Sequence, residues 1–114
     1  MNKLSDAEFQ QKSEATISQL EKVFSNLADT RDIDVEVTGG VLSITFEEGE
    51  PGKFIISPNS PAGQIWVSAR VSSFKFNWSD ERNDFVLSDT GEAIQAVMQR
   101  LTREQLGDES VELK

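Results

Sequence analysis

The sequence predicts an α+β fold, a two-layer sandwich in which one antiparallel sheet of five or six strands carries an N-terminal and a C-terminal helix on the same face. Apolar residues recur at helical spacing near both ends of the chain and alternate with polar residues in between. Connections of hairpin length favour antiparallel pairing, and alternation leaves one sheet face in water. We expect a single domain over residues 1–114.

The first helix is expected over residues 6–27. Ser5 and Glu8 have the spacing of a capping box, and Leu4 and Phe9 have that of a hydrophobic staple, so two start signals coincide. Side chains three or four positions apart then form one stripe that should face the core. The expected stripe consists of Phe9, Thr16, Ile17, Leu20, Phe24 and Leu27.

The strands are expected to begin soon after this helix, where the spacing of apolar residues changes from helical to every second position. Ile33, Val35 and Val37 should point to the core, so the carboxylates between them should face outward. Gly39-Gly40 tolerates the positive φ of a primed turn and should close a hairpin with the next strand. Later strands are expected near residues 54–56, 64–70, 74–78 and 84–87, with a loop over residues 58–63.

A second capping box predicts the start of the last helix. Asp89 has the position of its N-cap and Glu92 that of its N3 residue, and Gly107 should end it. We expect Val111 and Leu113 in the tail to pack between the two helices. The buried stripe of the last helix should consist of Ile94, Val97, Met98 and Leu101.

The composition excludes several kinds of site. The 114 residues include no Cys and no His, so this chain cannot build a zinc site, an iron–sulfur cluster site, a thiol nucleophile or a Ser-His-Asp triad. With 11 basic against 20 acidic side chains, the formal charge of −9 would repel nucleic acid. No apolar run is long enough for a membrane span. We expect a soluble, cytoplasmic protein that binds neither nucleic acid nor membranes.

Enzymatic activity is not expected. The paired acids Asp80 and Glu81, like Glu47 and Glu48, lie in predicted turns. Turns offer no burial that would raise the pKa of a carboxyl group toward the range that a general acid needs.

Acidic side chains are concentrated in the first part of the chain, where residues 1–50 hold 11 acidic and 4 basic side chains, a net charge of −7. Carboxylates on one face of a strand stand about 7 Å apart, too far to grip one ion tightly. Such an array suits weak, water-mediated sites for hard cations, a docking surface for a basic protein, or a merely solvated face. The candidate residues are Asp6, Glu8, Glu21, Asp29, Asp32, Asp34 and Glu36.

Trp66 stands on the polar side of its predicted strand, between Gln64 and Ser68 and after a loop that includes Asn59. Tryptophan is over-represented among residues that anchor protein interfaces, so these four residues form a candidate partner-binding site. The alternative is an outer-face aromatic side chain that only stacks on a cross-strand neighbour.

Four segments together resemble bacterial frataxins, the CyaY family of iron–sulfur cluster assembly proteins, and the resemblance extends over nearly the whole chain. An acidic alternating strand, a Gly-Gly hairpin and a Gln-x-Trp strand follow one another in the order that this family shows. The segments are DIDVE at residues 32–36, GGVLSITFE at 39–47, QIWVS at 64–68 and Gly91-Glu92.

This resemblance implies an acidic ridge on the first helix and the first strand that binds ferrous or ferric iron weakly and reversibly. It also implies that the ridge contacts a cysteine desulfurase, and that Trp66 and Gln64 meet the scaffold machinery of cluster assembly. The protein would then be a monomer that iron could drive to oligomerise, and it would hold no cluster itself. By position, the ridge would include Asp6, Glu8, Glu21, Asp32, Asp34 and Glu36.

Two other functions suit parts of the same pattern. A small acidic secretion chaperone, or another protein-binding adaptor, would share the size and charge of this chain, and such chaperones normally dimerise through an apolar surface. An iron-oxidising or iron-storage enzyme would need clustered, partly buried carboxylates, which the open spacing along a strand does not supply.

Overall fold

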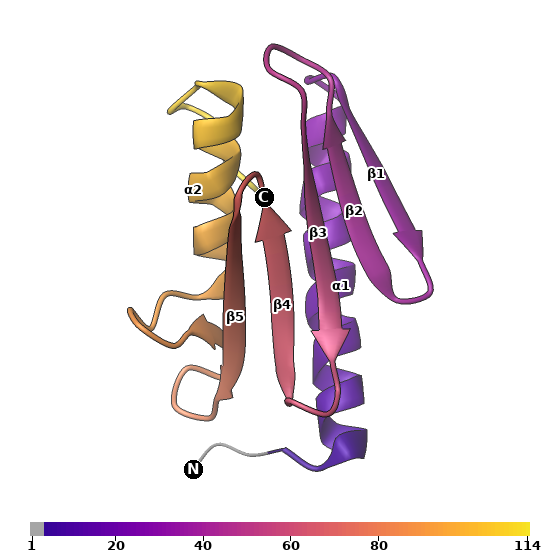
Figure 1. Cartoon of the computed structure of the whole chain (residues 1–114), viewed down its shortest axis with the longest axis vertical. Coiled ribbons are helices and arrows are strands. Elements are labelled where there is room, and N and C mark those ends of the chain that lie inside the picture. Colours follow the sequence, from indigo (N-terminus) through magenta and orange to yellow (C-terminus); the bar gives the residue numbers. More distant parts are fainter. Residues whose placement is uncertain (1–3) are drawn as a thin grey trace.

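The computed structural model describes residues 4–114, so the first three residues of the predicted domain lie outside the described part. Six strands form one antiparallel sheet in which each strand pairs with the next along the chain. Both helices lie on the same face of this sheet, as predicted (Figure 1). The elements are α1 (Asp6–Ala28), β1 (Ile33–Thr38), β2 (Val41–Phe46), β3 (Gly52–Asn59), β4 (Gln64–Ala69), β5 (Ser72–Ser79), β6 (Asp84–Leu87) and α2 (Ile94–Leu106).

The core lies between the sheet and the two helices. Alternate residues of the strands point to this layer, and α1 packs over β1 and β2 while α2 packs near β6. Aromatic side chains join the layers, because the ring of Phe85 meets Phe9 of α1 edge-on at 5.9 Å and Trp78 of β5 at 5.3 Å between ring centroids. The opposite sheet face carries no helix among the described residues and is open to solvent.

The predicted start of α1 is confirmed. The hydroxyl oxygen of Ser5 accepts a hydrogen bond from the backbone N–H of Glu8 at 3.2 Å, and the Glu8 carboxylate accepts one from the backbone N–H of Ser5 at 3.0 Å. The predicted stripe is largely correct, with two corrections: Thr16 is only partly buried because it lines a cavity, and Leu27 is half-buried. Ser13 and Val23 are buried as well and had not been expected there.

The Gly39-Gly40 hairpin is also confirmed. Both glycines have positive φ values, 59° and 81°, and Thr38 pairs with Val41 across them. The side chain of Val37, which was expected in the core, is 40% exposed, because the end of β1 next to the hairpin is less well covered.

The loop predicted over residues 58–63 is too long. Pro58 and Asn59 belong to β3, where they pair with Ile65 and Gln64 of β4. The pairing of β3 with β2 ends at Ile56, so Pro58 lies where β4 is the only neighbouring strand and its missing N–H interrupts no ladder with β2.

The predicted N-cap of α2 is wrong. The helix begins after Ala93, which has no side-chain capping bond, and Asp89 lies in a turn. Ala93 forms an antiparallel bridge with Val86, so the chain stays extended alongside β6 before the helix begins. The Glu92 side chain accepts a hydrogen bond from the Thr90 hydroxyl at 2.9 Å and pairs with Arg100. The buried stripe of α2 and its end at Gly107, with φ of 64°, are as predicted.

The C-terminal tail packs against both helices, as expected. Val111 and Leu113 are buried, and the Leu113 carbonyl oxygen accepts a hydrogen bond from Gln95 of α2 at 2.9 Å. The Lys114 carbonyl oxygen accepts one from Asn26 of α1 at 3.1 Å. In the part of the chain that the structure describes, neither helix is long and apolar enough to cross a membrane.

Candidate functional site

The strand carboxylates lie on the open face of the sheet. Asp34 and Glu36 are exposed, and their side chains point away from the helices because Ile33 and Val35 on the same strand point toward them. Cross-strand pairing places Glu36 beside Ser43, Ser43 beside Ile55 and Ile55 beside Ser68. Glu36 and Ser68 therefore occupy one row of the outer face, about 14 Å apart at 4.8 Å per strand.

The helix carboxylates do not gather with the strand carboxylates at one place. Asp6 and Asp29 lie at opposite ends of the 23-residue helix α1, about 34 Å apart along its axis at 1.5 Å per residue. Figure 1 shows that α1 begins at one end of the molecule, whereas β1 begins at the other. Asp29 is the C-cap of α1 and Asp32 immediately precedes β1, so these two residues and Asp34 lie toward the same end.

None of the seven predicted carboxylates forms an ion pair with another described residue. Glu8 is already engaged, because its carboxylate accepts the Ser5 backbone N–H and this hydrogen bond lowers its pKa. Within residues 4–114, no three acidic side chains converge on a common point as a tight metal site requires. The arrangement therefore suits weak cation attraction or contact with a basic surface, and not a closed metal centre.

Arg31, next to this acidic region in sequence, does not neutralise it. Its guanidinium donates to the Glu48 carboxylate at 2.7 Å and to the Asp108 carboxylate at 2.9 Å. The hydrogen bonds from Arg31 hold the pKa of Glu48 below its usual range. The charges of Asp32 and Asp34 consequently remain uncompensated by this arginine.

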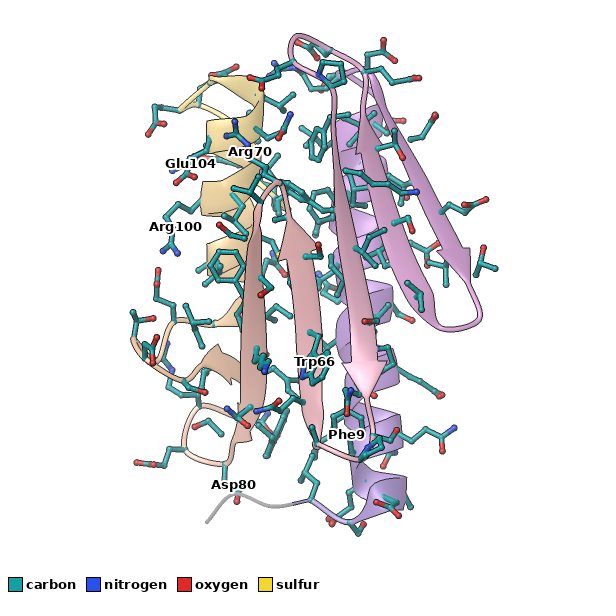
Figure 2. The ribbon with its side chains drawn as sticks, viewed as in Figure 1. Phe9, Trp66, Arg70, Asp80, Arg100 and Glu104 are labelled. Atoms are coloured by element: carbon teal, nitrogen blue, oxygen red, sulfur yellow. The ribbon has the colours of Figure 1, made fainter. Side chains whose placement is uncertain are left out.

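Trp66 lies on the same outer face as Glu36 and is 38% exposed (Figure 2). Its indole N–H donates to the Gln64 side-chain oxygen at 2.8 Å, and the ammonium group of Lys75, directly opposite on β5, lies 5.0 Å from the ring centroid. The ring therefore contacts a cross-strand neighbour, which was the alternative prediction, and part of its surface stays exposed, so its role in partner binding remains a prediction.

The side chain of Gln64 orients the tryptophan. Its amide nitrogen donates to Asn77 at 3.0 Å, and Asn77 in turn donates to the hydroxyl of Ser88. Asn59, the fourth candidate partner-binding residue, is half-buried, and its side-chain oxygen accepts the backbone N–H of Ala62 at 2.9 Å. The position of Asn59 is therefore explained by its role in the turn between β3 and β4.

A shallow hollow of about 250 Å³ adjoins the tryptophan on the outer face. Side chains of Ile55, Ser57 and Ser68 line it together with Trp66 and Lys75. Its lining is mostly apolar and it is partly open to solvent, which suits a side chain of a docked protein better than an enclosed small molecule.

Two residues of these surfaces were missed from the sequence. Lys75 is one, although the two-residue turn of Arg70 and Val71 fixes a register that sets Lys75 opposite Trp66. Glu14 is the other: it is exposed on α1 seven residues before Glu21, and this spacing places both on one side of the helix about 10 Å apart.

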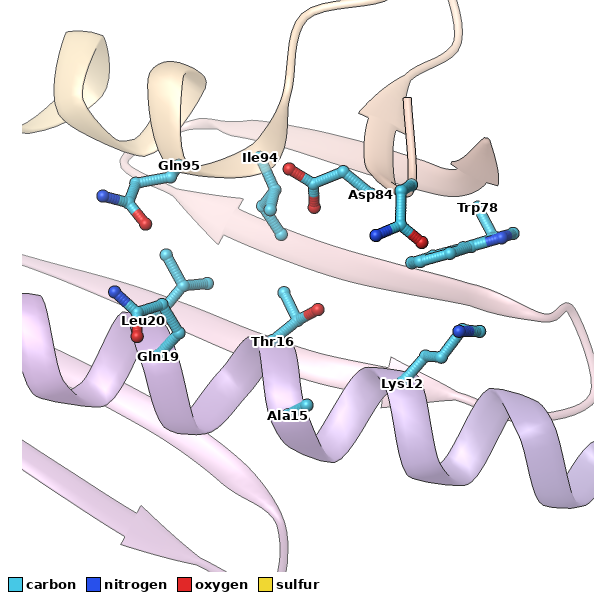
Figure 3. A pocket seen from close by; sticks show the side chains of 10 residues that line it. Lys12, Ala15, Thr16, Gln19, Leu20, Trp78, Asp84, Ile94 and Gln95 are labelled. Atoms are coloured by element: carbon cyan, nitrogen blue, oxygen red, sulfur yellow. The ribbon is translucent and has the colours of Figure 1, made fainter. Parts of the chain in front are cut away.

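A separate cavity of about 300 Å³ lies between α1, the β5–β6 hairpin and α2 (Figure 3). Lys12 lies over the Trp78 ring, 4.5 Å from its centroid. The Asp84 carboxylate points into the cavity, and burial raises its pKa. No residue that the sequence singled out as a binding candidate lines this cavity.

Two helices on one face of an open antiparallel meander, with carboxylates along the first helix and the edge strand, define the class of frataxin-like α+β sandwiches. The model of the frataxin-like domain family matches residues 2–108. The chain belongs to this family.

Named relatives agree with this assignment. The iron–sulfur cluster assembly protein CyaY of Azotobacter vinelandii is 30% identical over 93% of both chains, and CyaY of Ralstonia pickettii is 37% identical over 71% of both. The solved structure of a frataxin from Psychromonas ingrahamii superposes with a TM-score of 0.81 at 18% identity, covering 97% of this chain and 99% of that one. The fold and the family expected from the sequence are thereby confirmed.

Proposed function

We propose that this chain takes part in iron–sulfur cluster assembly as a non-enzymatic protein that binds iron weakly and regulates or supplies a cysteine desulfurase. Its family membership and the names of its relatives support the general role. The observation that carries the finer proposal is the position of Asp34 and Glu36, which are exposed, lie on the same sheet face as Trp66 and form no ion pair with a described residue.

Iron binding is proposed at the carboxylates near the start of β1. Carboxylate oxygens are suitable ligands for hard cations, and the open spacing of Asp32, Asp34 and Glu36 leaves most of the coordination shell to water. Binding of this kind is weak and reversible, as expected for an ion that is passed on. The ridge candidates Glu21 and Asp29 add to the negative potential that attracts the ion.

Docking to the desulfurase is proposed through the same face. A basic partner surface would be attracted to Asp34 and Glu36, and the hollow beside Trp66 would accept one of its side chains. We infer that the protein acts in the cytoplasm as a monomer, which iron can drive to oligomerise.

The docking proposal is tested by retention of the protein on immobilised cysteine desulfurase. We expect the double variant Asp34→Asn, Glu36→Gln to be retained at least about tenfold less, with a difference that shrinks in high salt. A matched control, Glu81→Gln with Glu109→Gln, makes the same change in charge at exposed positions away from the sheet face and should be retained like the unmodified protein. Equal retention of both double variants would contradict the proposal.

Iron binding is tested separately by NMR titration with ferrous iron under argon, and with calcium for comparison. We expect shifts and line broadening confined to residues near 29–36 and to the facing side of α1. Perturbation spread evenly over all acidic residues would show that the protein has no iron site.

A further inference from the structure

The outer edge of the sheet at β1 is an open pairing edge. β1 pairs only with β2, and a two-residue turn joins Thr38 to Val41. In such a hairpin the residues next to the turn exchange backbone hydrogen bonds, and pairs alternate from there, so Glu36 bonds to β2 whereas Val35 and Val37 do not. The N–H and C=O groups of these two valines therefore point away from the sheet, and no other described residue bonds to them.

The two faces of this edge differ in chemistry. Val35 is half-buried and Val37 is 40% exposed on the helix side. A groove of about 270 Å³ next to Val37 is lined by Ile17 and Pro58 and bordered by Glu14 of α1. On the other side, Asp34 and Glu36 face water. A strand added here would have alternate side chains against valines and against carboxylates.

We propose that β1 binds an extended segment of a basic partner protein as a seventh strand, with lysine or arginine side chains facing Asp34 and Glu36 and apolar side chains facing Val35 and Val37. This inference deepens the proposed function and rests on it for the identity of the partner. The backbone groups of the two valines supply hydrogen bonds, and the exposed side chain of Val37 supplies an apolar contact.

Charge selects this occupant over a second copy of the chain. If two β1 strands paired antiparallel with Val35 opposite Val35, Asp34 of each copy would lie opposite Glu36 of the other. Two like-charged contacts would result, one on each side of the central valine pair. Like charges directly opposite each other destabilise a sheet, so the edge disfavours itself. A basic strand reverses the sign of each of these contacts and is also attracted by Glu14 and Glu21 on the adjoining helix.

The test uses a synthetic ten-residue peptide of alternating lysine and valine as the probe. The pairing that we propose is antiparallel, so the peptide valines lie opposite Val35 and Val37 and their N–H groups are the ones that face β1. Methylation of the backbone nitrogens of the peptide valines should weaken binding at least about tenfold. Methylation of the backbone nitrogens of the peptide lysines should leave the dissociation constant unchanged. Calorimetry gives the constants, and slowed amide exchange at Val35 and Val37 locates the peptide.

Equal binding of the two methylated peptides, or protection elsewhere than at Val35 and Val37, would overturn the inference.

A protein variant separates edge pairing from the proposed function. Val37→Pro removes one outward N–H at an edge position where proline is tolerated, and its fold is checked by circular dichroism. If it is retained on the desulfurase like the unmodified protein while Asp34→Asn with Glu36→Gln is lost, acidic docking stands and edge pairing fails. If Val37→Pro also loses retention, edge pairing is supported.

Discussion

The Nη1 atom of Arg31 lies 2.9 Å from the Oδ2 atom of Asp108, a residue 77 positions later in the chain. The other two nitrogens of the same guanidinium donate to Glu48 at 2.7 to 3.1 Å. One side chain thus ties together the α1–β1 connection, the β2–β3 turn and the segment that follows α2. This junction holds the start of β1 in place, and with it the acidic residues proposed to bind iron and the desulfurase.

Arg31→Met should lower the free energy of unfolding by about 1 to 3 kcal/mol, because the Arg31 side chain is only 19% exposed and gives up several hydrogen bonds to charged partners. Urea unfolding at neutral pH measures the change. Arg70→Met is a matched control, since Arg70 is more exposed and lies 3.9 Å from its partner Glu50. A control variant as unstable as Arg31→Met would contradict this account.

The stabilisation by Arg31 should disappear in acid. Hydrogen bonds from Arg31 lower the pKa of Glu48. Hydrogen bonds from Ser110, and to a smaller extent from Arg31, lower the pKa of Asp108. A carboxyl group with a lowered pKa stabilises the fold above its ordinary value, 4.5 for Glu and 3.8 for Asp, and this stabilisation is lost as the pH falls through the pKa of the folded state. Urea midpoints of the unmodified protein and Arg31→Met should converge from about pH 5 downward, and a constant gap would refute the mechanism.

Asp84 should show the opposite pH dependence. Burial raises its pKa, so the folded protein binds this proton more tightly than the unfolded chain and loses stability as the pH rises from the ordinary value of 3.8 through the raised pKa of the folded state. Asp84→Asn keeps an oxygen that can accept the Phe85 N–H, and it should be more stable at neutral pH by at most about 1 kcal/mol, since Asp84 is partly screened by solvent. Thermal unfolding should show this gain fading in acid, and Asp89→Asn should show none.

The buried tail makes Leu113→Ala destabilising. Leu113 is 3% exposed, and removing a buried leucine side chain typically costs about 2 to 4 kcal/mol. Glu112→Ala, at the exposed neighbouring position, should leave the urea midpoint nearly unchanged. A small effect of Leu113→Ala would mean that the tail does not seal the space between the helices.

Features that depend on neighbouring residues could be predicted from the sequence. The Ser5–Glu8 capping box and the Gly39-Gly40 turn use side chains or φ values within four residues, and both formed as predicted. The outward position of Trp66 followed from alternation along one strand. These features together gave the fold class.

Features that depend on distant residues could not be predicted in this way. The N-cap of α2 is Ala93 and not the predicted Asp89, because Ala93 pairs with Val86. No local pattern in the sequence reveals this contact. Likewise, Asp6 and Asp34 belong to one acidic stretch of sequence. Asp6 lies at the start of α1 and Asp34 near the start of β1, and these two starts lie at opposite ends of the molecule. The candidate residues were thus identified by type, while their division between the helix layer and the sheet face required the structure.

Gly52→Ala should destabilise the contact between α2 and the sheet. A Cβ atom at residue 52 would lie 2.7 to 2.8 Å from the side-chain amide of Gln105, which is 6% exposed and donates to the Glu50 carbonyl oxygen at 2.8 Å. The amide cannot move aside without losing that bond, so we expect a cost of about 1 to 3 kcal/mol. The φ of Gly52 lies outside the left-handed region, so the cost comes from this contact and not from the backbone.

A double-mutant cycle with Gln105→Ala checks the cause. Gln105→Ala removes the three atoms that lie nearest the added methyl group, so Gly52→Ala should cost much less there than in the unmodified protein. A coupling energy of about 1 kcal/mol or more, from urea unfolding of the four proteins, is the expected result. Strictly additive effects would show that Gly52 is required for a reason other than the close approach of Gln105.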